Sequence, residues 1–143
     1  MTQFAIANRV NIIGSENMIY GIGADLVDPA RITKLLEKHG ERFAKRVLTE
    51  DEWENYKASA KPISFLASRF AAKEAFSKAV GTGFRHPVSL SNIGITNDDL
   101  GKPVFSFHPA LADWLDRKGI VAHHLTLTDE TNVVGAFVIL EKG

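Results

Sequence analysis

Two acids and a lysine stand out because their types and spacing suit chemistry on phosphates. Glu74 and Lys78 lie four residues apart in RFAAKEAFSKAVGTG (69–83), so on a helix they share one face. On an exposed helix this pair is a surface ion pair worth about 0.2–0.5 kcal/mol. The segment is apolar over most of its circumference, however, which is equally consistent with an acid at the wall of a cleft. Asp25 follows an apolar stretch and is either a turn residue or a second carboxylate of the same site.

Paired carboxylates with free coordination positions suit Mg²⁺, which prefers oxygen ligands, retains water and binds substrate phosphates. Three bases of the same segment would then offset the phosphate charge: Arg69, Lys73 and Lys78. The segment closes with Gly81, Thr82 and Gly83. This triplet is either a simple helix stop or a place where the backbone approaches a ligand closely.

Composition excludes several classes of protein. The 17 basic and 17 acidic residues cancel, which argues against a general nucleic-acid binder. The absence of cysteine excludes thiolate metal sites and a cysteine nucleophile, and it suits a reducing compartment. No apolar run reaches the roughly 20 residues that span a bilayer. Residues 1–17 lack the pattern of a secretory signal, and we expect a leader or tag-like, disordered extension before one domain at 18–143.

The elements that must position these residues follow from helix caps and from strand alternation. Asp28 and Pro29 indicate a helix start, and Thr49 with Glu52 fits a capping box. Pro62 opens a long helix that is apolar enough to be mostly buried. In chain order, we predict a strand (19–27), three helices (29–39, 50–56 and 63–80), two strands (91–98 and 102–108), a helix (109–118) and two strands (123–129 and 132–141).

This order of elements is typical of an α+β fold with a largely antiparallel sheet packed on the long buried helix. Residues 129–131 predict a tight hairpin link between the last two strands. Six bases against two acids between Arg31 and Arg46 indicate either solvated helix faces or a docking surface for an acidic partner.

The motifs GIGADLVDPARI, VLTEDEW, RFAAKEAFSKAVGTG and GKPVF, in this order, resemble the holo-[acyl-carrier-protein] synthases, the small bacterial class of 4′-phosphopantetheinyl transferases. The resemblance runs from Met18 to near the C-terminus. It implies the fold of that family and a trimer with the coenzyme A cleft between subunits. It also implies a cytoplasmic, Mg²⁺-dependent enzyme of fatty acid biosynthesis. Such an enzyme transfers phosphopantetheine from coenzyme A to a serine of apo acyl carrier protein and releases adenosine 3′,5′-bisphosphate.

The resemblance also implies roles for individual residues. Asp25 and Glu74 would hold Mg²⁺, and Lys78 would face the diphosphate. The carrier serine must lose its proton, and Glu74, directly or through a metal-bound water, is the best candidate base. Contacts with coenzyme A are predicted for six residues: Arg69, Lys73, Lys78, Gly81, Thr82 and Gly83. The basic first helix would dock the acidic carrier through three residues: Arg31, Lys38 and Arg42.

One departure from the family pattern concerns the late strand. Many members have a histidine-serine-histidine pattern there, whereas this chain reads HHLTLTDE, with Asp129 where the last histidine often stands. His123 and His124 alternate across a strand, so they do not readily share a metal, and one packed and one surface histidine are expected. No catalytic role is assigned to these three residues.

Two other functions use the same residues. A metal-dependent hydrolase of a nucleotide diphosphate would use water as the acceptor and would need no carrier. A non-catalytic module that senses a nucleotide or binds a carrier would bind without turnover. Analysis of the products with and without apo carrier distinguishes these hypotheses from the transferase.

Overall fold

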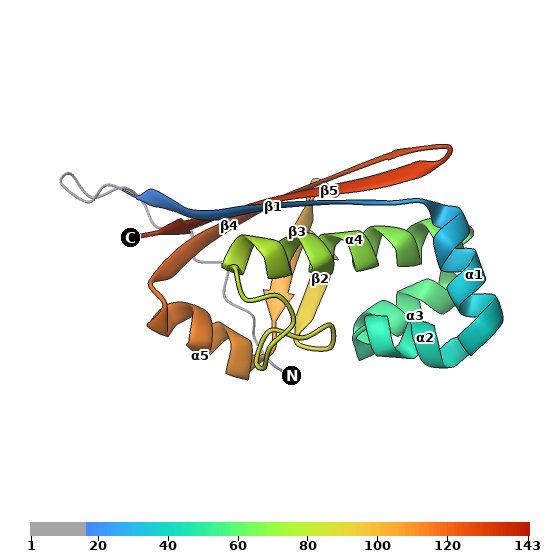
Figure 1. The fold of residues 1–143 in the computed structure, drawn as a ribbon, viewed down its shortest axis with the longest axis horizontal. Coiled ribbons are helices and arrows are strands. Elements are labelled where there is room, and N and C mark those ends of the chain that lie inside the picture. Colours follow the sequence, from blue (N-terminus) through green and yellow to red (C-terminus); the bar gives the residue numbers. More distant parts are fainter. Residues whose placement is uncertain (1–16) are drawn as a thin grey trace.

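A three-stranded antiparallel sheet lies along a long helix in the computed structural model, which describes residues 17–143 (Figure 1). The strands stand in the order β1 (Met18–Val27), β5 (Val133–Lys142) and β4 (Ile120–Glu130). The helix is α4 (Pro62–Val80), and 11 of its 19 residues are buried, as the apolar sequence predicted. The long buried helix and the antiparallel pairing of the α+β prediction are therefore confirmed.

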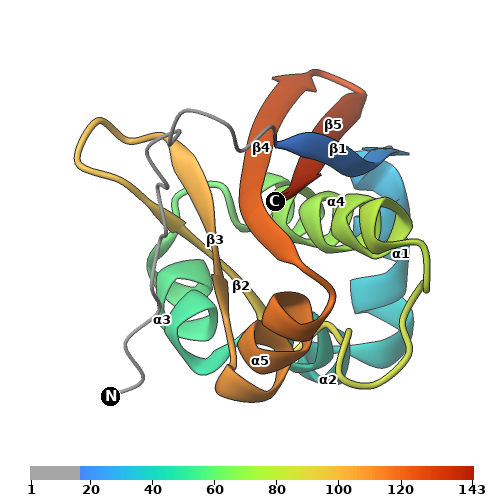
Figure 2. The same cartoon turned by 90° about the vertical axis from the view of Figure 1, so that its left-hand side faces the viewer.

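A second, smaller sheet departs from the expectation of one sheet. It pairs β2 (Ile93–Asn97) with β3 (Pro103–Phe107), also antiparallel, and α5 (Pro109–Arg117) follows it before β4 (Figure 2). Among residues 17–143, no helix is both long enough and apolar enough to cross a membrane.

Three short helices connect β1 to α4. They are α1 (Pro29–His39), α2 (Glu41–Val47) and α3 (Glu50–Ala58). Asp28 caps α1 through its side chain, and Thr49 with Glu52 forms the predicted capping box of α3. Helix α2, which begins immediately after Gly40 ends α1, was not predicted from the sequence.

The link between the last two strands is later than predicted. Strand β4 continues through Glu130, so the turn consists of Thr131 and Asn132 rather than residues 129–131. The two histidines of β4 behave as expected. His123 packs edge-on against Phe107, with ring centroids 5.2 Å apart, while the exposed His124 contacts Glu141 at 2.7 Å.

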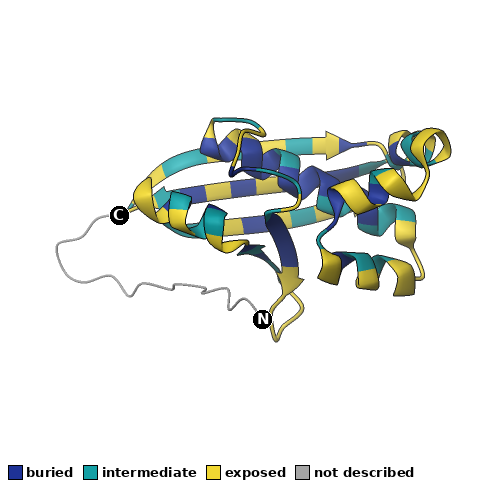
Figure 3. Cartoon of the chain, turned by 90° about the horizontal axis from the view of Figure 1, so that it is seen from below, coloured by how far each residue is buried: buried dark blue, intermediate teal, exposed yellow. Residues whose placement is uncertain are grey.

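The two faces of the three-stranded sheet differ sharply in exposure. Along β1, residues 21, 23, 25 and 27 are shielded, whereas the residues between them are exposed. Figure 3 shows this alternation of buried and exposed positions along the strands. The outer face nevertheless carries large apolar side chains that are 41–68% exposed: Ile22, Leu26, Phe137 and Ile139. An apolar face of this kind is typical of a surface that contacts another protein.

Candidate active site

Asp25 and Lys78 meet where β1 crosses α4. Asp25 lies on the shielded face of β1, and its side chain is 17% exposed. The Lys78 ammonium donates to Asp25 Oδ1 at 3.2 Å and to the backbone oxygen of Ala24 at 3.0 Å. Glu74 lies one helical turn before Lys78. The structure thus brings together the three residues that the spacing singled out.

Glu74 interacts electrostatically with Asp25 where α4 packs against β1. Partial burial raises the pKa of Glu74, and the negative charge of Asp25 raises it further, while Lys78 and Arg31 oppose the increase. Two carboxylates that repel each other are a suitable donor set for a divalent cation. Within residues 17–143 no cluster of three or more histidines, cysteines or acids is present, so water and substrate oxygens would complete the shell. Asp25 and Glu74 therefore fit Mg²⁺, with two carboxylates from the protein and the other positions for water and substrate.

The basic residues expected to dock a carrier lie on two helices rather than one. Arg31 is exposed in the first turn of α1, with its guanidinium 5.6 Å from the centre of the Phe70 ring, and its charge acts on Glu74. Lys38 is exposed in the last turn of α1. Arg42 is exposed on α2, beyond Gly40, which corrects its assignment to the first helix.

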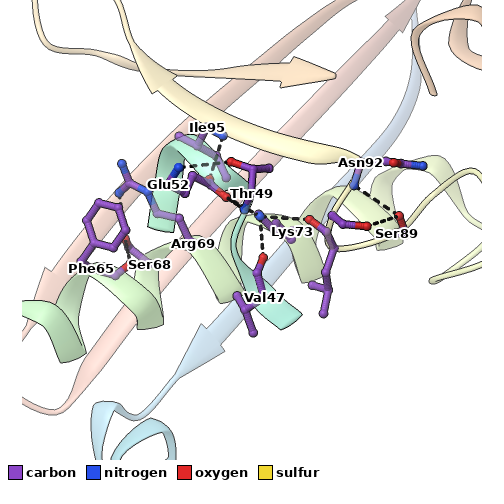
Figure 4. A network of polar contacts seen from close by, with 12 residues as sticks. Val47, Thr49, Glu52, Phe65, Ser68, Arg69, Lys73, Ser89, Asn92 and Ile95 are labelled. Atoms are coloured by element: carbon purple, nitrogen blue, oxygen red, sulfur yellow. Dashed lines mark hydrogen bonds and ion pairs between the residues drawn. The ribbon is translucent and has the colours of Figure 1, made fainter. Parts of the chain in front are cut away.

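Lys73 does not point toward a phosphate site, contrary to the prediction from the sequence. Its side chain is fully buried, and its ammonium donates to the backbone oxygens of Val47 (2.6 Å) and Leu90 (3.0 Å) and to Glu52 Oε1 (2.6 Å) (Figure 4). A lysine ammonium has three donors, and all three are occupied inside the chain. The prediction that Lys73 contacts the phosphates of coenzyme A is therefore wrong.

Glu52 is the partner that sequence reasoning missed. Its Oε1 also accepts from the Thr49 backbone at 2.9 Å, and its Oε2 accepts from the Ile95 backbone at 3.0 Å. Burial lowers the pKa of Lys73, and the charge of Glu52 opposes that decrease. Glu52 thereby joins α3 to α4 through a buried ion pair with Lys73, and to β2 through the hydrogen bond from Ile95.

Arg69 lies far from Lys78 along the same helix. Their separation of nine positions in the sequence corresponds to about 14 Å of helix. The Arg69 guanidinium lies 4.1 Å from the centre of the Phe65 ring and donates to Ser68 at 3.1 Å, and burial lowers its pKa. It lines a cleft of about 310 Å³ together with Asp129. Within one chain, Arg69 therefore lines clefts that include neither Asp25 nor Glu74.

The three residues after α4 form its C-terminal cap. Gly81 has φ 85° and Gly83 has φ 64°, a region that favours glycine. The Gly83 backbone donates to Ser77 at 3.2 Å, and the Thr82 hydroxyl donates to the backbone oxygen of Gly83 at 2.8 Å. The helix-stop interpretation accounts for this geometry, and contact of the triplet with a nucleotide stays a prediction.

Comparison with known proteins assigns this arrangement to a family. The family model described as the 4′-phosphopantetheinyl transferase superfamily matches residues 21–132, which include Asp25, Glu74 and Lys78. The chain belongs to this superfamily. Among its curated relatives, the holo-[acyl-carrier-protein] synthase of Nitrosospira multiformis is 63% identical over 125 residues, which cover 87% of this chain and 100% of the relative. The resemblance drawn from the motifs is therefore confirmed.

Solved structures within the superfamily agree. The crystal structure of holo-[acyl-carrier-protein] synthase from Neisseria meningitidis matches with a TM-score of 0.86 at 53% identity, over 87% of this chain and 100% of that one. The enzyme from Bacillus anthracis in complex with CoA (3′,5′-ADP) matches with a TM-score of 0.73 at 38% identity, over 88% and 99% of the two chains. The fold expected from the resemblance is thus the fold observed.

Proposed function

We propose that this chain transfers the 4′-phosphopantetheine group of coenzyme A to a serine of apo acyl carrier protein, as a cytoplasmic enzyme of fatty acid biosynthesis. The contact of Asp25 with Lys78, next to Glu74, carries the proposal, because it places paired acids and an ammonium at one point of a transferase fold. The names of the relatives support the choice of substrates.

Each residue of this site has a role in the proposed reaction. When bound by Asp25 and Glu74, Mg²⁺ would supply Lewis acidity toward the diphosphate. Glu74 takes the proton of the carrier serine, whose oxygen forms a bond to the phosphorus next to the pantetheine arm. The bond from that phosphorus to the bridging oxygen breaks, and adenosine 3′,5′-bisphosphate leaves. Lys78 stabilises the charge on the departing phosphate. Arg31, Lys38 and Arg42 hold the acidic carrier beside Glu74.

The proposed enzyme is a homotrimer with the coenzyme A cleft between subunits. Two observations support this assembly. The outer sheet face exposes large apolar side chains, and the cleft beside Arg69 and Asp129 lies too far along α4 to complete the site of its own chain. In a trimer, the cleft beside Arg69 and Asp129 of one subunit can lie next to Asp25 and Glu74 of its neighbour.

Replacing Phe137 with glutamate is expected to dissociate the trimer and to lower kcat/KM by about tenfold or more, because a charge in an apolar interface core is costly. Phe137 is 44% exposed in the single chain. Light scattering coupled to size-exclusion chromatography measures the mass. The control is Arg117→Glu, an exposed position in the last turn of α5, which should leave the mass unchanged. A Phe137→Glu protein that remains trimeric would contradict this interface.

The transferase itself is tested by incubating the protein with coenzyme A, Mg²⁺ and apo acyl carrier protein, and by weighing the carrier with mass spectrometry. A carrier that gains one phosphopantetheine, and fails to gain it in EDTA, supports the proposal. Cleaved coenzyme A beside an unchanged carrier would favour the hydrolase. Intact coenzyme A that nevertheless binds would favour the sensing module.

A further inference from the structure

Two glycines on the shielded face of β1 lie directly against the backbone of α4. A Cβ atom built on Gly23 would lie 1.9 Å from the backbone oxygen of Ala75 and 2.8 Å from the backbone nitrogen of Ala79. A Cβ on Gly21 would lie 1.9 Å from the backbone oxygen of Ala79. Both obstacles are helix backbone, so no side-chain rotation relieves them, and the strand or the helix would have to retreat by about 1 Å or more.

Strand β1 is held by β5 on one edge and by α4 on its shielded face. Among residues 17–143 it is an edge strand whose strand partner is β5, and the contact with α4 sets its distance from the helix. Alternation along the strand places Gly23 and Asp25 on the same face, about 7 Å apart, with Gly21 about 13 Å from Asp25. The close approach at Gly23 brings Asp25 within 3.2 Å of Lys78, on the helix that also carries Glu74.

We infer that Gly23 is a positioning residue for the paired acids: its missing side chain sets the strand-to-helix distance at which Asp25 and Glu74 can bind one divalent cation. Gly23 touches no substrate and acts only through Asp25. This inference rests on the proposed function, because it takes the two acids as the metal pair.

The test compares Gly23→Ala with Gly21→Ala, since both add the same methyl group against the same helix. Mn²⁺, which shares the oxygen preference of Mg²⁺, is titrated into each protein without substrate, and free Mn²⁺ is followed by electron paramagnetic resonance. Gly23→Ala is expected to raise the Mn²⁺ dissociation constant about tenfold or more. Gly21→Ala should raise the Mn²⁺ dissociation constant less than about threefold. It should lower the melting temperature about as much as Gly23→Ala does. Should Gly23→Ala unfold at room temperature, all proteins are compared in the cold with trimethylamine oxide, which favours the compact state.

A rescue variant separates positioning from general loss of structure. The longer acid of Asp25→Glu should weaken Mn²⁺ binding in the wild-type background but improve it in the Gly23→Ala background, where the strand stands farther from the helix. A Gly23→Ala protein that binds Mn²⁺ like the wild type, or equal weakening by the two alanine variants, overturns the inference.

The proposed metal pair is checked in the same titration with Asp25→Asn. A wild-type protein that binds Mn²⁺ no better than Asp25→Asn contradicts the metal pair and, with it, the role of Gly23. When the wild type binds better than Asp25→Asn but Gly23→Ala matches the wild type, only the positioning role fails.

Discussion

Replacing Glu74 with glutamine is expected to lower kcat/KM by about 100-fold or more and, at the same time, to raise the melting temperature of the metal-free protein at neutral pH. The activity falls because an amide neither accepts the serine proton nor contributes an anionic metal ligand. The stability rises because the ionised Glu74 is partly desolvated and faces Asp25, as its raised pKa indicates.

The pH dependence of this gain has a definite sign. The folded-state pKa of Glu74 is raised above its ordinary value of 4.5. The folded protein therefore holds a proton more tightly than the unfolded chain, and Glu74 loses its favourable contribution as pH rises through the raised pKa. The gain in melting temperature from Glu74→Gln should thus be present at pH 7 and vanish below about pH 4.

Thermal melts in EDTA between pH 3.5 and 8 measure this effect, alongside the carrier assay. The matched control is Glu54→Gln, because Glu54 is an exposed acid of α3 that forms a surface ion pair with Lys57. The control should keep its activity and show no pH-dependent gain. An active Glu74→Gln enzyme would remove Glu74 from the site, and a variant less stable than the wild type at pH 7 would contradict the carboxylate repulsion.

Replacing Lys73 with methionine is expected to destabilise the protein by about 3–5 kcal/mol. The substitution keeps an unbranched side chain that is one atom shorter, and it removes the charge that compensates Glu52, which is 2% exposed. It also leaves the backbone oxygens of Val47 and Leu90 without their donor. Urea unfolding of the variant, followed by circular dichroism, measures the loss.

Two further variants show whether the buried charge is the cause. The double variant Glu52→Gln/Lys73→Met should recover part of the loss, since no isolated carboxylate remains in the core. Lys57→Met removes a surface lysine whose side chain is 49% exposed, and it should change stability by less than about 0.5 kcal/mol. If Lys73→Met costs no more than Lys57→Met, the buried ion pair is not an important contributor to stability.

Local signals in the sequence were sufficient for most of the elements. The Asp28 cap, the capping box at Thr49 and the stop at Gly81 each act within a few residues, so their patterns are legible without the fold. The α4 segment was recognisably buried because its apolar residues surround the helix. The pairing of Glu74 with Lys78 could also be predicted, because a spacing of four residues places two side chains on the same face of a helix.

Contacts between distant segments could not be predicted in this way. The ion pair of Glu52 with Lys73 joins two helices across 21 residues, and no local pattern distinguishes a buried lysine from its neighbour on the same charged segment. Lys73 was predicted to bind phosphate because it is one of three bases in this helix. The sequence does not show that its side chain points into the core. The separation of the strands into two sheets also depends on pairing between strands, which alternation alone leaves undetermined.

The pairing of β1 with β5 has a consequence for synthesis on the ribosome. Val27 lies opposite Val134, so in the part of the chain that the structure describes, the strand that carries Asp25 pairs with a strand more than 100 residues later. The helices and β2–β3 can begin to fold while the chain is still emerging, but β1 must wait for β5 to leave the exit tunnel. A nascent chain stalled before residue 133 would therefore contain Asp25, Glu74 and Lys78 without the sheet that holds them together.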